Sequence, residues 1–364
     1  MKDNKEWLQM VEHIEKIDHQ SYVGYYNGYR LLKMSGLENV PPEIFICAGN
    51  RTGGKSFFFK RFLTLMNKEY NTQFLWVTRK ITQVTGCSRS FYEDICHCDD
   101  IGTEWEIEAY ARNVKSLSYN GNIMGYFTYL NYATDLKELS NMFNCVDVIV
   151  KDEFQSEVNE YVEDEMIKIR SIHKSVSRGY GQKTRYCPNI WIGNQTSIIN
   201  PYYVSLGIHK RLRPDTHYMR GKGYALEVFF NEEASRKSRE SAFETAFGED
   251  EYSQSANQNI FLDNTSFIKR MDTSKMRPQF SIGVLKEWYS VWHAGTCFYV
   301  STQKITRGTR FAIDVDSHTD NSILLRRSDP VFRSMKEYFD KGRFYFENLE
   351  AKNACASLFM LTII

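Results

Sequence analysis

The stretch Gly49-Asn50-Arg51-Thr52-Gly53-Gly54-Lys55-Ser56 decides how the first half of this chain folds. It matches the phosphate-loop pattern G-x-x-x-x-G-K-S/T, in which glycines let the backbone turn tightly and point successive N–H groups at phosphate oxygens. In such a loop the lysine reaches the terminal phosphates and the last hydroxyl ligates magnesium. We therefore predict that this stretch binds a nucleoside triphosphate, with Lys55 on the phosphates and Ser56 on Mg²⁺.

The residues around this loop have the pattern of an α/β domain. Residues 44–48 (IFICA) form an apolar run typical of a buried strand, and residues 57–66 continue with a helical pattern. A second buried strand is predicted over residues 73–78 (QFLWVT), and it ends in Arg79. Alternating apolar residues over 104–130, with Asn120-Gly121 between them, predict a hairpin. The fold class is therefore α/β, of the P-loop nucleoside-triphosphatase type.

A pair of carboxylates follows a third predicted strand. Residues 142–150 lead into Asp152 and Glu153, and we expect this strand to lie beside the strand of the phosphate loop. Asp152 would then hold the magnesium and Glu153 would be the general base that activates water. The alternative is an ordinary acidic helix start, because carboxylates favour helix N-termini. Another predicted strand, 189–193, ends in Asn194, which is placed to hydrogen-bond the attacking water or the γ-phosphate.

A long segment without acidic residues comes next. Residues 166–214 contain nine Lys and Arg but no Asp or Glu, whereas the whole chain has a formal net charge of only +1. Apolar residues recur at helical spacing over 158–177, which predicts one amphipathic helix. The cations indicate either contact with a polyanion or a solvated face, and the sequence leaves both open.

Two arginines near the end of this helix are candidates for a role at a neighbouring subunit. In oligomeric ATP hydrolases an arginine supplied by the next subunit stabilises the charge that develops on the γ-phosphate. Arg178 is the first candidate because it lies at the predicted helix end, before a glycine-containing loop, and Arg185 is the second. The alternative is that both are surface arginines on a basic face.

Length and composition predict two folded domains in a reducing compartment. The chain has 364 residues, more than one core usually holds, and 15% of them are aromatic. We predict a P-loop domain over residues 1–230, a polar linker over 231–262 and a small α+β domain over 263–364. The cysteines are scattered, and neither a secretory signal nor an apolar run of membrane-spanning length occurs, so a cytosolic setting without membrane contact is expected.

A tyrosine cluster precedes the first strand. Tyr22, Tyr25, Tyr26 and Tyr29 lie within eight positions of one another. Aromatic rings so close to a phosphate loop favour either stacking on the nucleotide base or packing in the core, and both readings stay open.

In the order and the residues of these motifs, the chain resembles the genome-packaging ATPases of small tailed phages with protein-primed DNA replication, a branch of the terminase-like packaging motors. The resemblance rests on the phosphate loop with its internal Arg51, the strand ending in Arg79, the run 149–154 (IVKDEF), and Ser177-Arg178. Its most specific part is the stretch 193–203 (GNQTSIINPYY). The fold it implies is a P-loop domain of the additional-strand conserved-Glu type, then a linker and a ribonuclease-H-like domain.

The same resemblance implies a function and partners. It implies an ATP-driven translocase that packages double-stranded DNA into a prohead, working with Mg²⁺ as a ring of identical subunits, a pentamer, in the host cytoplasm. The ring would dock transiently on the phage portal, or connector, and a packaging RNA is a further candidate partner. Two other functions stay open: a terminase large subunit with a working nuclease or a helicase, and an assembly factor that binds ATP for structure only.

Roles for single residues follow from the resemblance as well. It implies a catalytic set of Glu153, Arg178 and Lys55, with Arg178 acting on the nucleotide of the neighbouring subunit. Arg79 resembles the basic residue that covers the nucleotide or links adjacent subunits. Ser56 and Asp152 would hold the metal. The implied nucleotide-binding set is Gly49, Asn50, Arg51, Thr52, Gly53, Gly54, Lys55, Ser56, Arg79 and Asn194.

The C-terminal domain lacks a feature that active packaging nucleases of this fold need. Such nucleases hold two metals with acids on the first strand and on later elements. The predicted first strand, residues 279–285, has no carboxylate. Asp314 and Asp316 are expected on one face of a later strand, without a partner on the first. We therefore expect a domain without nuclease activity.

Overall fold

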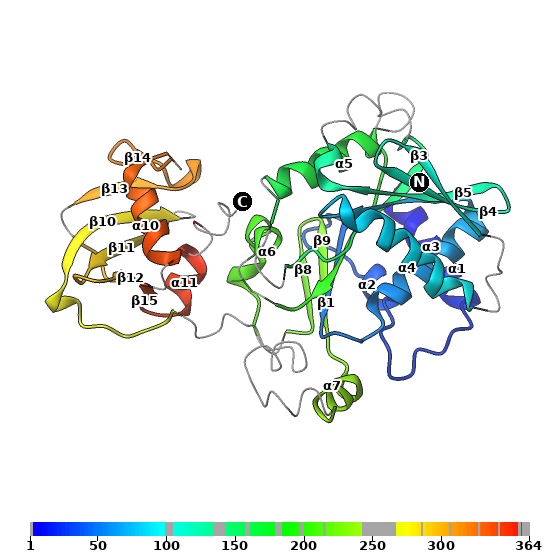
Figure 1. Ribbon diagram of the computed structural model, residues 1–364, viewed down its shortest axis with the longest axis horizontal. Helices are drawn as coiled ribbons and strands as arrows, with labels where there is room; N and C mark the ends of the chain where they lie inside the picture. The colour runs from blue at the N-terminus through cyan, green and yellow to red at the C-terminus, as the bar shows by residue number, and fades with distance from the viewer. Residues whose placement is uncertain are drawn as a thin grey trace. The chain divides into compact units, whose positions relative to one another are not determined.

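The computed structural model describes residues 3–98, 105–133, 143–156, 161–162, 164–178, 184–196, 198, 200–213, 216–241, 267–284, 287–305, 308–326, 328–340, 343–355 and 358. The chain divides into two compact units (Figure 1). The first comprises residues 1–196 and 212–260, and the second comprises residues 197–211 and 261–364. The second unit thus includes a short segment from the middle of the chain.

The first unit is built on a nine-stranded sheet with the order β3-β4-β5-β2-β6-β7-β1-β9-β8. Its strands are β1 (Ile44–Gly49), β2 (Gln73–Thr78), β3 (Trp105–Ala111), β4 (Val114–Tyr119), β5 (Asn122–Tyr129), β6 (Val146–Lys151), β7 (Asn189–Asn194), β8 (Tyr218–Gly221) and β9 (Tyr224–Phe229). The strands from β5 to β9 along this order run parallel, and antiparallel strands flank them at both ends. The predicted α/β fold class and the hairpin at Asn120-Gly121 are confirmed.

Strand β7 separates the phosphate-loop strand from the acidic strand. It pairs in parallel with β1, where Gly49 lies opposite Asn194, and with β6, where Lys151 lies opposite Trp191. The expectation that the acidic strand lies directly beside β1 is therefore wrong. Since the three strands are parallel, their carboxyl ends still meet at one edge of the sheet, the usual place for ligands in α/β folds. The additional strand brings Asn194 to that edge.

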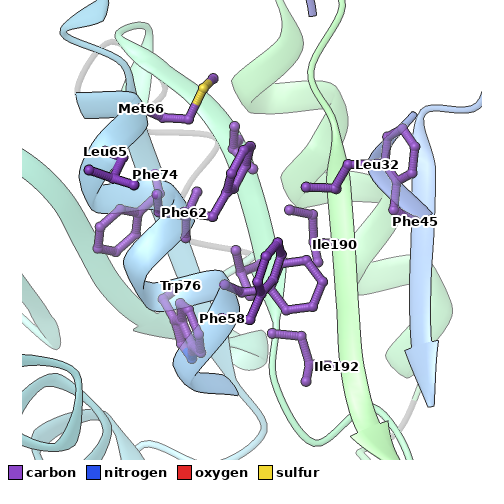
Figure 2. Close-up of a cluster of buried hydrophobic side chains, with 14 of the residues drawn as sticks. Leu32, Phe45, Phe58, Phe62, Leu65, Met66, Phe74, Trp76, Ile190 and Ile192 are labelled. Atoms are coloured by element: carbon purple, nitrogen blue, oxygen red, sulfur yellow. The ribbon is translucent and has the colours of Figure 1, made fainter. Parts of the chain in front are cut away.

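Helices cover both faces of this sheet. They are α1 (Asn4–Ile17), α2 (Tyr29–Leu32), α3 (Lys55–Tyr70), α4 (Thr82–Cys96) and α5 (Glu165–Ser177), with a 3₁₀ turn η1 at Leu130–Ala133. A further helix, α7 (Glu232–Arg239), follows β9. Because side chains alternate along a strand, Phe74 and Trp76 pack with α1, α3 and α4, whereas Leu75 and Val77 pack with α5. Figure 2 shows the first of these two cores, with Phe62 of α3 among strand residues.

Helix α5 is shorter than the sequence pattern predicted. It begins at Glu165, and Asp164 before it has a left-handed backbone with φ of 52°. Tyr161 and Val162, which fit the helical spacing, lie outside the helix. The N–H of Val162 donates instead to the Glu165 carboxylate at 2.9 Å. A left-handed residue interrupts a right-handed helix. The apolar spacing therefore extends further toward the N-terminus than the helix itself.

The second unit is α+β, as predicted. Its sheet has the order β14-β13-β10-β11-β12-β15. Its elements are α6 (Pro201–Ser205), β10 (Arg277–Val284), β11 (Glu287–His293), β12 (Phe298–Ser301), β13 (Thr309–Ala312), β14 (Ile323–Leu324), α10 (Pro330–Asp340), β15 (Phe344–Phe346), α11 (Leu349–Cys355) and the 3₁₀ turns η4 (Ile208–Lys210), η5 (Thr273–Lys275) and η6 (Val315–Ser317). Phe332, Met335 and Ala351 from its helices pack on Ile282 and Val300, and Val204 of α6 joins the same core.

The strand predicted over residues 310–315 ends earlier, at Ala312. Asp314 instead caps the turn η6, where its carboxylate accepts the N–H of Ser317 at 2.7 Å, and Asp316 lies inside that turn. The expectation that the two aspartates share one face of a strand is therefore wrong. Among the helices of the described ranges, none is long and apolar enough to cross a bilayer.

Candidate nucleotide-binding site

One cavity of about 680 Å³ lies at the carboxyl edge of the first unit's sheet. Its volume falls in the range of sites that hold a nucleotide-sized ligand. The cavity is lined by most of the residues that the sequence singled out, namely Arg51, Thr52, Gly53, Gly54, Lys55, Ser56, Arg79, Asp152, Glu153 and Asn194. Segments that are far apart in sequence therefore meet where nucleotide chemistry was expected.

The backbone of the phosphate loop needs its glycines. Gly54 has a left-handed φ of 80°, which side chains rarely adopt, and Thr52 is also left-handed at 59°. A Cβ at Gly49 would lie 2.2 Å from the main-chain oxygen of Phe229 in β9. The loop therefore passes against the neighbouring strand at a distance that only glycine permits, and α3 begins directly after it at Lys55.

Lys55 is aimed into the loop. Its ammonium donates to the main-chain oxygens of Gly49, at 3.2 Å, and of Asn50. It also lies 3.4 Å from the side-chain oxygen of Asn194. Burial lowers the pKa of Lys55, and the nearby Asp152 carboxylate opposes that shift. A buried ammonium whose partners are mostly neutral oxygens is suited to bind anionic phosphate oxygens.

Asp152 and Glu153 follow β6 and differ in their surroundings. The pKa of Asp152 is raised by burial first and by the neighbouring Glu153 carboxylate second. A divalent cation would favour its charged form, and Asp152 shares the cavity with the Ser56 hydroxyl, so these two residues fit a magnesium ion. Glu153 is exposed to the cavity, has a left-handed φ of 50°, and accepts a hydrogen bond from Gln83 Nε2 at 3.3 Å.

Arg79 holds the chain segment that carries these acids. Its guanidinium donates to the main-chain oxygens of Glu153 at 2.8 Å and Phe154 at 3.0 Å. It also forms an ion pair with Glu165 of α5 at 3.2 Å, and both side chains are buried. The sequence predicted Arg79 as a nucleotide contact but indicated neither Glu165 nor Gln83. Both partners are ordinary polar residues on helices, without a motif of their own.

Comparisons with known proteins show the family to which this chain belongs. Residues 21–364 match the family model of the Podovirus DNA encapsidation protein (Gp16). The chain belongs to this family. The resemblance to packaging ATPases of small tailed phages that the motifs indicated is thereby confirmed. A comparison with curated proteins gave no match.

Two solved structures are similar to this member of the encapsidation family. One is the bacteriophage Phi-29 viral genome packaging motor assembly, with 21% identity, a TM-score of 0.56, and coverage of 93% of this chain and 99% of that chain. The other is the Phi-28 gp11 DNA packaging motor, with 14% identity, a TM-score of 0.58, and coverage of 94% and 98%. The shared fold therefore extends over nearly the whole chain, including the nuclease-like second unit.

Two residues predicted as nucleotide contacts, Gly49 and Asn50, do not line the cavity. The Asn50 side chain donates to the main-chain oxygen of Asn231 at 3.0 Å and accepts the N–H of Asn231 at 2.9 Å. Asn231, just before α7, also donates to Gly24. The main chain of Tyr26 donates to Gly53 at 2.8 Å. The loop is thus braced from two distant segments.

The tyrosine cluster divides into three packing residues and one exposed residue. Tyr22, Tyr26 and Tyr29 surround the ring of Phe58 in edge contacts, with centroids 5.0–5.5 Å apart. Tyr25 is 61% exposed. Its ring lies 3.3 Å from the position that a Cβ on Gly54 would take. Tyr25 alone of the four therefore has its ring outside the core and next to the phosphate loop.

The two candidate arginines also differ. Arg185 is held within its own unit, because it pairs with Asp147 at 3.0 Å and donates to the main-chain oxygens of Val146 and Val176. Arg178 is exposed at the end of α5, does not line the cavity, and makes no side-chain bond with another described residue. Of the two, Arg178 is thus the one whose side chain is exposed and not engaged by the described residues.

The second unit shows no arrangement for catalysis by metal in the part that the structure describes. No group of three or more His, Cys, Asp or Glu side chains there is placed to hold an ion. Its strand β10 carries no carboxylate, and the Asp314 carboxylate is engaged by the backbone and hydroxyl of Ser317.

Proposed function

We propose that this chain hydrolyses ATP to drive double-stranded DNA into a viral prohead, as a ring of identical subunits. The observation that carries the proposal is the single cavity that joins the phosphate loop, the Asp152-Glu153 pair and Asn194. Membership in a family of DNA encapsidation proteins supports the choice of DNA as the cargo.

The residues of the cavity divide the work of hydrolysis. Lys55 and the N–H groups of the loop hold the phosphates, and Ser56 and Asp152 hold Mg²⁺, which when bound neutralises phosphate charge. Glu153 faces the cavity and accepts the proton of the attacking water, a contribution typically worth about 10²–10⁴ in rate. Asn194, which contacts Lys55 from β7, orients that water or the γ-phosphate.

Arg178 completes the site of the next subunit. In ATP hydrolases that receive an arginine from a neighbour, its charge is worth about 10³–10⁵ in rate. An exposed arginine without a partner in its own described chain fits that role, whereas Arg185 is engaged by Asp147. This proposal makes the working assembly a closed ring, for which we propose five subunits, docked on the phage portal in the host cytoplasm.

The second unit serves binding rather than cleavage in this proposal. The lack of an acid on β10 and the use of Asp314 as a turn cap both support a domain without nuclease activity. A nuclease-like fold that does not cut DNA remains available to contact DNA, the portal or a packaging RNA.

The test is ATP turnover by the purified chain with and without duplex DNA, proheads and portal, together with protection of the DNA from added nuclease. We expect turnover that duplex DNA stimulates, and protected DNA when proheads are present. A chain that binds ATP but never turns it over would be an assembly factor. Nicking of plasmid with Mg²⁺ or Mn²⁺ would indicate a working nuclease, and stimulation by single strands alone would indicate a helicase.

A further inference from the structure

Helix α5 presents a row of cations on the side away from the core. Its apolar side chains, among them Ile169, Ile172 and Val176, are buried in the core beneath it. Arg170, Lys174 and Arg178, four positions apart, are exposed. A spacing of four residues places them about 6 Å apart along the axis and within about 80° around it. The row therefore forms one line about 12 Å long.

Among the described residues, no acidic side chain pairs with this row. No hydrogen bond or ion pair joins its side chains to another residue that the structure describes, and the sequence has no Asp or Glu from 166 to 214. Helix α7 provides a contrast, because it pairs Lys237 with Glu233 and Arg236 with Glu240 within itself. An exposed helix commonly supports itself by such pairs. In α5 the charge is left for an external partner.

We propose that Arg170 and Lys174 bind the phosphate backbone of duplex DNA. One DNA strand carries a phosphate about every 3.4 Å along the helix axis, so these two cations, about 6 Å apart along α5, reach roughly two phosphates. Evenly spaced cations that lack directional partners are suited to a backbone whose charge is regular and independent of sequence. Apart from Ile167, which is 62% exposed, this face has no large apolar anchor of the kind that centres protein interfaces.

This inference rests on the proposed function, since it gives the DNA cargo a place on the molecule. It does not use Arg178, which the proposed function assigns to the neighbouring subunit, and neither of the two residues named as DNA contacts lines the nucleotide cavity. Helix α5 starts at Glu165, the partner of Arg79, and Arg79 in turn holds Glu153. The surface that receives DNA would therefore lie on the helix that is anchored to the segment bearing the general base.

The experiment measures how the affinity for a 30-base-pair DNA duplex depends on salt, by fluorescence anisotropy with the full chain and a non-hydrolysable ATP analogue. The test variant is Arg170→Gln/Lys174→Gln. Each lost phosphate contact reduces the slope of log K against log salt by about 0.9, so we expect a slope about 1.8 shallower than in the wild type. Between 50 and 200 mM salt the wild type should then lose about tenfold more affinity than the variant.

The matched control is Lys5→Gln/Lys16→Gln, which removes two exposed cations of α1, on the other face of the sheet. Its slope should equal that of the wild type, and melting curves should show that both variants are folded. A wild-type slope retained by the α5 variant would overturn the inference while leaving DNA binding intact. Absence of DNA binding by the wild type would overturn the proposed function as well.

Two further results would assign the row to another partner and so also overturn the inference. Loss of ring assembly in sedimentation, with an unchanged DNA slope, would make the face a contact between subunits. A slope change seen with an RNA duplex of the same length, and not with DNA, would make it a site for RNA.

Discussion

The guanidinium of Arg79 lies 2.8 Å from the main-chain oxygen of Glu153 and on its other side pairs with the buried Glu165. Replacing Arg79 by Met leaves the Glu165 carboxylate buried without its cation. Breaking a buried pair in this way costs about 3–5 kcal/mol of unfolding free energy. Denaturant titration of Arg79→Met should show this loss, and Arg79→Met/Glu165→Met should recover part of it. Equal losses in both variants would show that the pair itself is not the cause.

Glu153→Gln should separate nucleotide binding from hydrolysis. The amide keeps the shape of the side chain but cannot accept a proton, so steady-state turnover should fall by about 10²–10⁴-fold. Affinity for ATP, measured with a fluorescent analogue, should change little because Lys55 and the loop remain. The exposed Glu106→Gln on β3 serves as the control. Turnover at the wild-type level would remove Glu153 from the role of general base.

Arg178→Ala should act across the boundary between subunits. When Arg178→Ala chains are mixed with Glu153→Gln chains in one ring, some sites take Glu153 from one chain and Arg178 from its neighbour, so the two inactive variants should together recover part of the ATP turnover. The control is Arg112→Ala, at the exposed turn between β3 and β4. A mixture that recovers no turnover would place the effect of Arg178 in its own site.

Tyr25 should contribute to ATP affinity through its ring. Stacking of an aromatic side chain on a base is worth about 1–3 kcal/mol. Tyr25→Ala should therefore raise KM for ATP about 5- to 150-fold, whereas Tyr25→Phe, which keeps the ring, should not. If the Phe variant is impaired as severely as the Ala variant, the hydroxyl rather than stacking is responsible.

Glu227 should make stability depend on pH. It lies in β9, accepts hydrogen bonds from Tyr26 at 2.8 Å and Tyr218 at 2.9 Å, and burial raises its pKa above the ordinary 4.5. The folded state therefore holds this proton more tightly than the unfolded state does, so the contribution of Glu227 to stability is fully present below pH 4.5 and is lost as pH rises through the folded pKa. Unfolding free energies measured across this range should fall in the wild type relative to Glu227→Gln. Parallel curves for the two proteins would contradict this.

Much of the first unit follows from local pattern. The phosphate loop, the apolar strands before and after it, and the acids after β6 are each encoded within a few residues, and the structure brings them to one cavity. The carboxyl ends of parallel strands meet at one edge of the sheet. Residues that follow these strands in the sequence could therefore be predicted to lie close together in space.

The parts that the sequence did not predict depend on distant partners. The bond between Arg79 and Glu165 spans 86 positions, and the position of β7 between β1 and β6 is a matter of strand pairing, which periodicity does not encode. The shortened α5 and the early end of β13 have a different cause. Asp164 has a left-handed backbone just before α5, and β13 ends at Ala312, before Asp314 caps η6, although the apolar pattern continues in both places.

Helix α6 begins seven residues after Asn194, yet its Val204 packs in the core of the second unit. A chain shortened after residue 260 would keep α6 but lose the strands that its apolar Val204 packs with. That side chain would then be exposed to water. The second unit therefore takes one of its helices from within the first unit's stretch of sequence, and a cut at residue 260 does not separate the two.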